Sequence, residues 1–186
     1  MSNDVIKVLV VEDSDPDYRL IEEYVSLSKD LEIQLERAER LSSAIARLNS
    51  SNFDAVLLDL TLPDSRGRDT VVEMREEIQS VPIVVLSGVE DEKIAVECVS
   101  KGAQDYLVKS RVNTEDIVRA LRYAIQRHRI QEGIAKARKE FESGEFKAAD
   151  ARETVSPSPR TKTVFSETGP TTLDQETISS YANRLA

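Results

Sequence analysis

The sequence predicts a doubly wound α/β fold, in which helices cover both faces of a parallel sheet. Five short strand-like segments alternate with segments of helical periodicity through the first two-thirds of the chain. This repeated order is typical of parallel sheets, because each right-handed crossover returns through a helix. The composition agrees, since a 40% hydrophobic and 32% charged chain of 186 residues suits one globular domain plus an extension.

The first half of the chain supplies three of the five predicted strands. Residues 5–11 and 55–60 are continuous apolar runs, as in strands that are buried on both faces. Residues 33–36 alternate between apolar and polar, which indicates a half-exposed edge strand. Asp15-Pro16 opens an amphipathic helix with an N-cap and a first-turn proline. A shorter helix is expected around Ala44, Ile45 and Leu48.

The second half completes the alternation. Proline, glycine and polar residues make 61–69 a loop. Gly102 follows the second predicted helix of this half and is suited to end it. The predicted elements, in order, are a helix over 70–78, a strand over 83–86, a helix over 92–100, a strand over 105–108 and a long helix from about Thr114, with a core stripe of Ile117, Leu121, Ala124 and Ile125.

Three of the apolar runs end in reactive polar residues. The first runs into Glu12 and Asp13, the one at 55–58 into Asp59, and the one at 106–108 into Lys109. Because the carboxyl ends of neighbouring parallel strands converge on one crevice, these side chains should share a small pocket. Clustered carboxylates repel one another and are costly to desolvate, so the cluster predicts a divalent cation, with the lysine completing the site.

The whole set of motifs resembles the receiver domain of bacterial response regulators, over residues 4–128. The resemblance rests on Val10-Val11-Glu12-Asp13, Leu57-Leu58-Asp59-Leu60-Thr61-Leu62-Pro63-Asp64, Val85-Leu86-Ser87-Gly88 and Gly102-Ala103-Gln104-Asp105-Tyr106-Leu107-Val108-Lys109. It implies a five-stranded, flavodoxin-like sheet of order 2-1-3-4-5. It also implies a two-component signalling protein that receives a phosphoryl group.

By that resemblance, Asp59 is the phosphoacceptor in a Mg²⁺ site. Asp13 and Asp59 would bind the ion directly, together with the backbone carbonyl of Thr61, and Glu12 would hold a coordinated water. Lys109 would pair with the phosphoryl oxygens.

The resemblance also assigns a switch to two residues. Ser87 would donate its hydroxyl to the phosphoryl group, and Tyr106 would reorient in response. The family commonly has a cis proline after the lysine, whereas this chain has Ser110, so we expect a trans bond there.

Beyond the domain, the sequence predicts three further segments. Residues 129–147 are helix-prone and charged, and read as an exposed helical extension through which a homodimer is a further hypothesis. Residues 148–171 are rich in serine, threonine and proline and read as a disordered linker. Residues 172–186 form an amphipathic pattern, which is either a docking element or the start of a truncated domain.

Composition limits the partners. A net charge of −9 and a pI near 4.8 argue against nonspecific binding to nucleic acid or anionic membranes. The start of the chain lacks an apolar leader, no run reaches transmembrane length, and the single cysteine, Cys98, allows no intrachain disulfide. We therefore expect a cytoplasmic protein. His128, the only histidine, is expected to be a solvated helix residue, so the phosphoryl group must come from a histidine kinase, a histidine phosphotransfer protein or a small donor.

The expected function is a response regulator that switches a protein–protein interaction surface. It would not be an enzyme, beyond self-phosphorylation from small donors and self-dephosphorylation. Two alternatives stay open: a receiver-fold adaptor that ignores phosphate, and the receiver fragment of a longer protein with a missing output domain. The tail has no helix-turn-helix pattern, so this chain is not expected to bind DNA.

Overall fold

The computed structural model describes residues 5–28, 31–88 and 90–142. Two units divide the chain, 1–146 and 147–186, and every described residue belongs to the first. The predicted linker over 148–171 and the predicted helix over 172–186 lie outside the described residues, as do the last five positions of the predicted extension. The proposed boundaries of these segments stay predictions.

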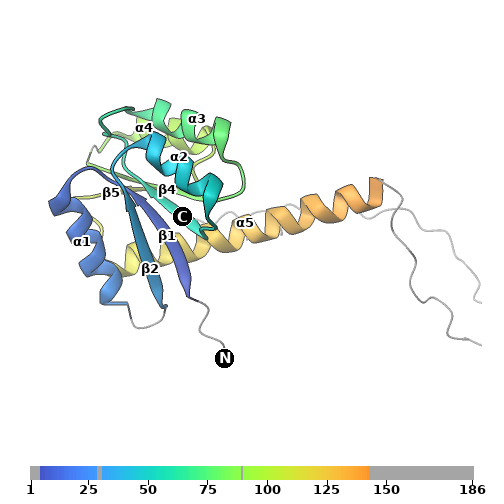
Figure 1. The fold of residues 1–186 in the computed structure, drawn as a ribbon, viewed down its shortest axis with the longest axis horizontal. Coiled ribbons are helices and arrows are strands. Elements are labelled where there is room, and N and C mark those ends of the chain that lie inside the picture. Colours follow the sequence, from blue (N-terminus) through green and yellow to red (C-terminus); the bar gives the residue numbers. More distant parts are fainter. Residues whose placement is uncertain (1–4, 29–30, 89, 143–186) are drawn as a thin grey trace, which may run out of the picture. The chain divides into compact units, whose positions relative to one another are not determined.

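Five parallel strands form one sheet of order β2-β1-β3-β4-β5, with helices on both faces (Figure 1). The fold class and strand order expected from the sequence are therefore confirmed. In chain order the elements are β1 (Ile6–Val11), α1 (Asp15–Ser26), β2 (Ile33–Ala38), α2 (Leu41–Ser50), β3 (Ala55–Leu58), α3 (Arg68–Glu77), β4 (Ile83–Ser87), α4 (Glu92–Ser100), β5 (Asp105–Val108) and α5 (Thr114–Glu142).

Alternate side chains of the central strands build two separate cores. Val8 and Val10 of β1 pack with α1 and α5, whereas Leu9 and Val11 pack on the other face with α2, α3 and α4. Because successive strand residues point to opposite faces, a continuous apolar run can supply both cores at once. This arrangement leaves only the ends of the central strands for polar chemistry.

Two predicted helix starts need correction. Ser14, not Asp15, is the N-cap of α1: its hydroxyl accepts a hydrogen bond from the backbone N–H of Asp17, at 3.4 Å. α3 begins at Arg68 rather than Thr70, because Gly67 adopts a φ of 65° and turns the chain directly into the helix. The loop that follows Asp59 is accordingly shorter than expected.

The last helix continues past the sheet. Its predicted core stripe, from Ile117 to Ile125, is buried, and beyond it Ile130, Ile134 and Phe141 are exposed. The expectation that His128 is solvated was wrong: its side chain is only 14% exposed, and Nε2 lies 2.7 Å from the carbonyl oxygen of Ser80. α5 therefore packs against the connection between α3 and β4 one turn further than its core stripe indicates.

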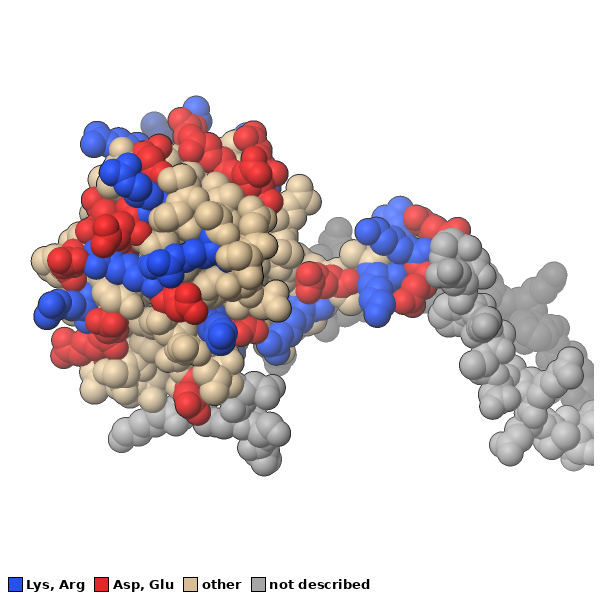
Figure 2. Space-filling view, in the orientation of Figure 1, with Lys and Arg blue, Asp and Glu red and all other residues tan. Residues whose placement is uncertain are grey.

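Acidic and basic side chains are interspersed on the face shown in Figure 2, both on the domain and along the exposed part of α5. Within the described residues, no helix is long and apolar enough to cross a membrane.

Candidate functional site

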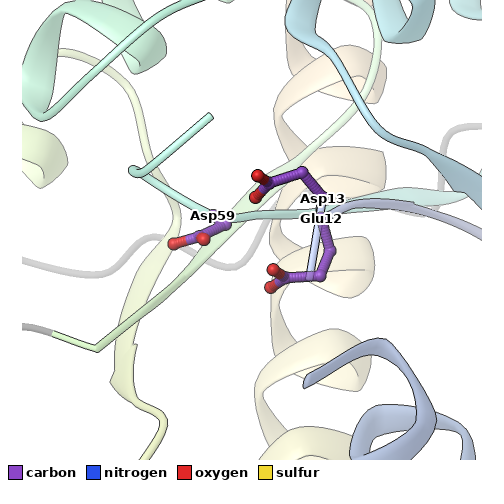
Figure 3. Close-up of side chains that lie close together, drawn as sticks. All are labelled: Glu12, Asp13 and Asp59. Carbon is purple, nitrogen blue, oxygen red and sulfur yellow. The ribbon is translucent and has the colours of Figure 1, made fainter. Parts of the chain in front are cut away.

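The predicted site residues come together at the carboxyl edge of the sheet. β1 and β3 are neighbours, and the backbone N–H of Asp59 donates to the carbonyl oxygen of Val11 at 3.0 Å. Asp59 therefore lies beside Glu12 and Asp13, which follow β1 directly (Figure 3). Oxygen atoms from the three carboxylates all lie within 4.8 Å of one another. The convergence expected from parallel strands thus places three acids in one pocket.

Two of these acids are almost completely buried. Glu12 is 1% exposed and Asp59 5% exposed, whereas Asp13 is exposed to solvent. Burial raises the pKa of both Glu12 and Asp59, since desolvation disfavours the charged form, and it outweighs the lowering effect of Lys109. Asp59 also raises the pKa of Glu12 by direct repulsion. The negative charges in the pocket are therefore unfavourable on their own, and a bound cation would stabilise them.

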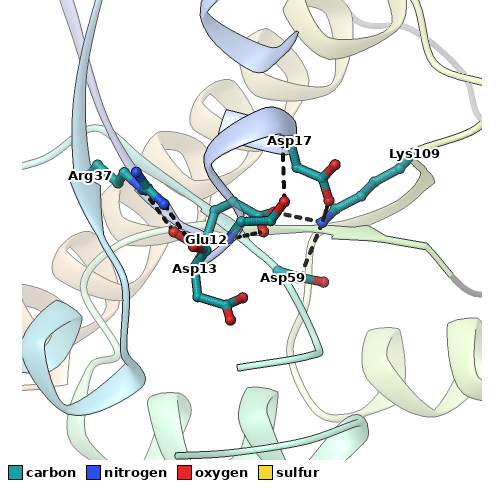
Figure 4. Close-up of polar contacts among 7 residues, drawn as sticks. Glu12, Asp13, Asp17, Arg37, Asp59 and Lys109 are labelled. Carbon is teal, nitrogen blue, oxygen red and sulfur yellow. Dashed lines mark hydrogen bonds and ion pairs between the residues drawn. The ribbon is translucent and has the colours of Figure 1, made fainter. Parts of the chain in front are cut away.

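Lys109 supplies one positive charge from the end of β5. Its Nζ lies 2.6 Å from Glu12 Oε2, 2.7 Å from Asp17 Oδ2 and 3.1 Å from Asp59 Oδ2 (Figure 4). Burial alone would lower the pKa of this lysine, but its hydrogen bonds to Asp17 and Glu12 and the charge of Asp59 outweigh burial and raise the pKa. Lys109 is therefore held charged at the centre of the cluster. The described residues contain no cis peptide bond, so the bond to Ser110 is trans, as expected.

The second oxygen of Asp59 fits a metal ligand. Oδ1 is buried and makes no hydrogen bond within the described part of the chain. A buried carboxylate oxygen without a partner is costly, and a hard divalent cation such as Mg²⁺ is bound by oxygen ligands of this kind. Glu12 and Asp13 supply the neighbouring carboxylates. Thr61 lies in the loop after β3, which a bridge to Arg66 closes, and the role of its carbonyl oxygen stays a prediction.

Ser87 and Tyr106 lie on the strands that separate Asp59 from the outer edge. Ser87 ends β4, between β3 and β5, and is 1% exposed. Its carbonyl oxygen accepts a hydrogen bond from the backbone N–H of Lys109 at 2.8 Å. The backbones of the two predicted phosphoryl-binding residues are therefore held next to each other. Tyr106 is half-buried on the edge strand β5, against the core formed with α2, α3 and α4.

Arg37 was missed in the sequence, although it holds the loop that carries the acids. From β2 it donates to the carbonyl oxygens of Glu12 and Asp13, each at 2.9 Å (Figure 4), and it pairs with the carboxylate of Asp15. Its guanidinium carbon lies 5.0 Å from the ring centre of Tyr18. The alternation in β2 indicated an edge strand, but nothing in it indicated that this polar residue reaches back over β1.

Asp17 was also missed, and it brings a fourth carboxylate to the site. It stands in the first turn of α1 and is 42% exposed, and its Oδ2 contacts Lys109. Its position four residues after Asp13, on a helix that starts at the site, was a usable signal. The distance of 92 residues between Asp17 and Lys109 hid the contact.

The loop after β3 is anchored at its far end by two further residues. Asp64 accepts hydrogen bonds from the backbone N–H groups of Leu41 and Ser42, at 2.9 and 3.0 Å, and so caps α2 from outside. Burial would raise the pKa of Asp64, but the Ser42 and Leu41 hydrogen bonds lower it overall. Arg68 pairs with Glu97 at 3.1 Å and links α3 to α4. These contacts fix the loop that leads away from Asp59.

Similar proteins were found by sequence. Swarming motility regulation protein RssB of Serratia marcescens is 34% identical over 97 residues, which are 48% of this chain and 44% of that protein. Transcriptional regulatory protein KdpE of Staphylococcus aureus is 31% identical over 134 residues, 72% of this chain and 53% of that protein. The chain thus spans about half the length of the curated relatives it matches.

Solved structures agree on the fold. The Mn(2+)-bound form of response regulator Rcp1 is 30% identical, with a TM-score of 0.51, over 62% of this chain and 88% of that chain. A CheY-like receiver domain protein from Methanospirillum hungatei has a TM-score of 0.57 at 17% identity, over 68% of this chain and 98% of that chain. The family model of the response regulator receiver domain matches residues 8–122. The chain therefore belongs to the response regulator receiver domain family.

Proposed function

We propose that this protein is a two-component response regulator that accepts a phosphoryl group on Asp59 in a Mg²⁺-dependent reaction. One observation carries the proposal: Asp59 is buried between two acids and a lysine, with one carboxylate oxygen on Lys109 and the other without a hydrogen-bond partner among the described residues. The donor would be the phosphohistidine of a histidine kinase or of a histidine phosphotransfer protein, or a small phosphodonor.

The transfer step needs little from the protein except positioning and charge. A carboxylate oxygen of Asp59 attacks the phosphorus, and the bond to the donor nitrogen or oxygen breaks as the new O–P bond forms. The leaving group keeps the electron pair. Lys109 stabilises the negative charge of the phosphoryl oxygens, and the hydroxyl of Ser87 donates to another of them.

Asp13 and Asp59 would hold the metal directly, with the carbonyl oxygen of Thr61, and Glu12 would hold a metal-bound water. The bound ion would neutralise the acids and offset the charge that develops during transfer. The proximity of the three carboxylates and the unpartnered Oδ1 of Asp59 support this assignment. The similarity to Rcp1, of which a Mn(2+)-bound form has been solved, adds to that support.

The face formed by α4, β5 and α5 would be the surface that binds the downstream partner. Ser87 and Tyr106 would be the switch, because one stands at the carboxyl edge and the other on the half-buried edge strand that borders this face. A serine drawn toward the phosphoryl group would free space for the tyrosine to move. The downstream partner would be a protein that reads this face.

Several predictions about the whole protein stay predictions. They are the cytoplasmic location, the absence of nucleic-acid partners, the homodimer, and the absence of enzymatic activity on outside substrates. KdpE and ResD are named transcriptional regulatory proteins, and the matches cover 53% and 45% of those proteins. The receiver part of the chain therefore does not decide which output the whole protein has.

Intact-mass spectrometry with acetyl phosphate and Mg²⁺ tests the proposal. The wild-type protein should gain one phosphoryl group, and Asp59→Asn should gain none. Asp69→Asn is the matched control, because it removes an exposed acid of α3 whose ion pair is with Arg68 and not with Lys109, and it should keep the gain. If wild type gains no phosphoryl group from acetyl phosphate or from a cognate kinase, the adaptor that ignores phosphate is the correct alternative.

A further inference from the structure

Lys109 has three N–H donors, and in this structure three carboxylates already take them. The acceptors are Glu12, Asp17 and Asp59, at 2.6, 2.7 and 3.1 Å from Nζ. An ammonium group has no further donor to offer. A phosphoryl group that arrives on Asp59 therefore has to displace at least one of the existing acceptors before Lys109 can bind it.

The three acceptors differ in how easily they can be released. Glu12 is 1% exposed and the side chain of Asp59 6% exposed, so either would be left as a buried charge without its cation. Asp17 is 42% exposed, and water can replace the lysine at its carboxylate. Release of Asp17 is therefore the least costly of the three.

A small, mostly apolar cavity lies beside the Lys109 side chain and offers its ammonium group few other partners. Lys109 and Asp17 line a small cavity of about 20 Å³, whose other walls are mostly apolar and include Leu86 and Ile117. The cavity has room for about one water molecule, and its walls offer few polar partners. The ammonium group thus has carboxylates rather than bulk water as its partners on this side.

We propose that Asp17 is a positioning residue that holds Lys109 while Asp59 is unmodified and releases it when the phosphoryl group arrives. This inference rests on the proposed function of Asp59. Because the Asp17 contact stabilises the unmodified protein and is lost on transfer, it slows phosphorylation. Removing its charge should therefore speed the reaction.

The test measures the rate of phosphorylation of the full chain by acetyl phosphate at saturating Mg²⁺. Asp17→Asn keeps the shape of the side chain and should react about two- to fivefold faster, the size expected for loss of a partly exposed ion pair. Glu23→Gln is the matched control: it removes one negative charge from the same helix without contacting Lys109, and it should react at the wild-type rate. Urea unfolding checks that both variants are folded.

A second donor separates release of the lysine from a general charge effect. Phosphoramidate carries less negative charge than acetyl phosphate. If Asp17 slowed the reaction only by repelling the donor, Asp17→Asn would be accelerated less with phosphoramidate than with acetyl phosphate. Release of Lys109 predicts the same acceleration with both donors.

An Asp17→Asn rate equal to or below that of wild type, with wild type still phosphorylated, overturns the inference and leaves the proposed function standing. An acceleration confined to acetyl phosphate also overturns it. If wild type accepts no phosphoryl group at all, the proposed function itself fails and the inference falls with it.

Discussion

Replacing Arg37 with methionine should loosen the loop that carries the metal-binding acids. Methionine keeps an unbranched stem of similar length but removes every donor of the guanidinium. The two lost hydrogen bonds run to the carbonyl oxygens of Glu12 and Asp13, and both are 2.9 Å long. Within the described residues, the side-chain hydrogen bonds from β2 to the β1–α1 loop come from Arg37, beside one backbone bond from the N–H of Glu12 to the carbonyl oxygen of Ala38.

The size of the effect follows from these two bonds. A hydrogen bond to a charged group contributes about 1.5–3 kcal/mol net. The side chain of Arg37 is 19% exposed and water can reach the freed carbonyl groups, so the lower end of that range applies. With about 1.5 kcal/mol for each of the two bonds, we expect Arg37→Met to lower the free energy of unfolding by about 3 kcal/mol. We also expect Mg²⁺ to bind about tenfold more weakly. Without Arg37, about 1.4 kcal/mol of the binding free energy of the ion would be used to order the loop.

Urea denaturation without Mg²⁺ measures the first quantity, and isothermal titration calorimetry with Mg²⁺ the second. Arg47→Met is the matched control, because Arg47 is 49% exposed and its ion pair with Glu36 is 3.6 Å long. It should change stability by less than about 0.5 kcal/mol and leave Mg²⁺ affinity unchanged. If both variants are equally destabilised, Arg37 does not hold the loop. If Arg37→Met is destabilised but binds Mg²⁺ normally, the loop does not position the acids.

Three further outcomes are expected. Asp64→Ala removes the outside cap of α2 and should destabilise the protein by about 1 kcal/mol in urea unfolding, and no change would mean that α2 is capped adequately without it. Without metal, Asp59→Asn should be more stable than wild type near neutral pH. The folded-state pKa of Asp59 is raised, so the folded state binds more protons than the unfolded chain, and wild-type stability falls as pH rises from the ordinary carboxylate range through the raised value. The advantage of Asp59→Asn should disappear on acidification, and an advantage independent of pH would contradict this assignment. Leu121→Ala, at a position with no exposure, should cost about 3 kcal/mol in chemical denaturation, whereas Val96→Ala, 62% exposed, should cost little; equal losses would argue against the α5 core.

The sequence was sufficient for the sheet and for the residues at its edge. Continuous apolar runs identify strands buried on both faces, and parallel strands bring their carboxyl ends together, so Glu12, Asp59 and Lys109 could be placed in one pocket without coordinates. Arg37 and Asp17 could not be placed in this way. Their contacts are made by long side chains, Arg37 and Lys109, that reach residues on other elements. The partners are 24 to 25 residues apart in sequence for Arg37 and 92 residues apart for the Asp17–Lys109 pair.

Local capping and packing account for the smaller errors. Ser14 and Asp15 are both suitable N-caps, and only the backbone path decides between them. His128 lies seven residues after Leu121 and three after Ile125, so helical periodicity places it on the core face of α5, and the prediction of a solvated residue did not use this signal. The sequence does not indicate which residue this face of α5 contacts, because His128 and Ser80, on the α3–β4 connection, are 48 residues apart.

The charges of the pocket explain why one lysine can serve both states of the proposed switch. Unmodified, the site holds four carboxylates and one lysine: Lys109 contacts three of them, and the fourth, Asp13, lies beside Glu12 and Asp59. Glu12 and Asp59 are buried with raised pKa values. A divalent cation would offset two negative charges, while a phosphoryl group adds about one-half to one negative charge beyond that of the carboxylate it modifies. Metal and phosphoryl group together would leave the local charge closer to balance than the unmodified pocket. A phosphoryl group alone would instead add an anion to a site that already repels one. Dependence on Mg²⁺ is therefore expected of the acceptor reaction itself, and phosphorylation of Asp59 that proceeds equally well in excess chelator would show that Lys109 alone balances the charge.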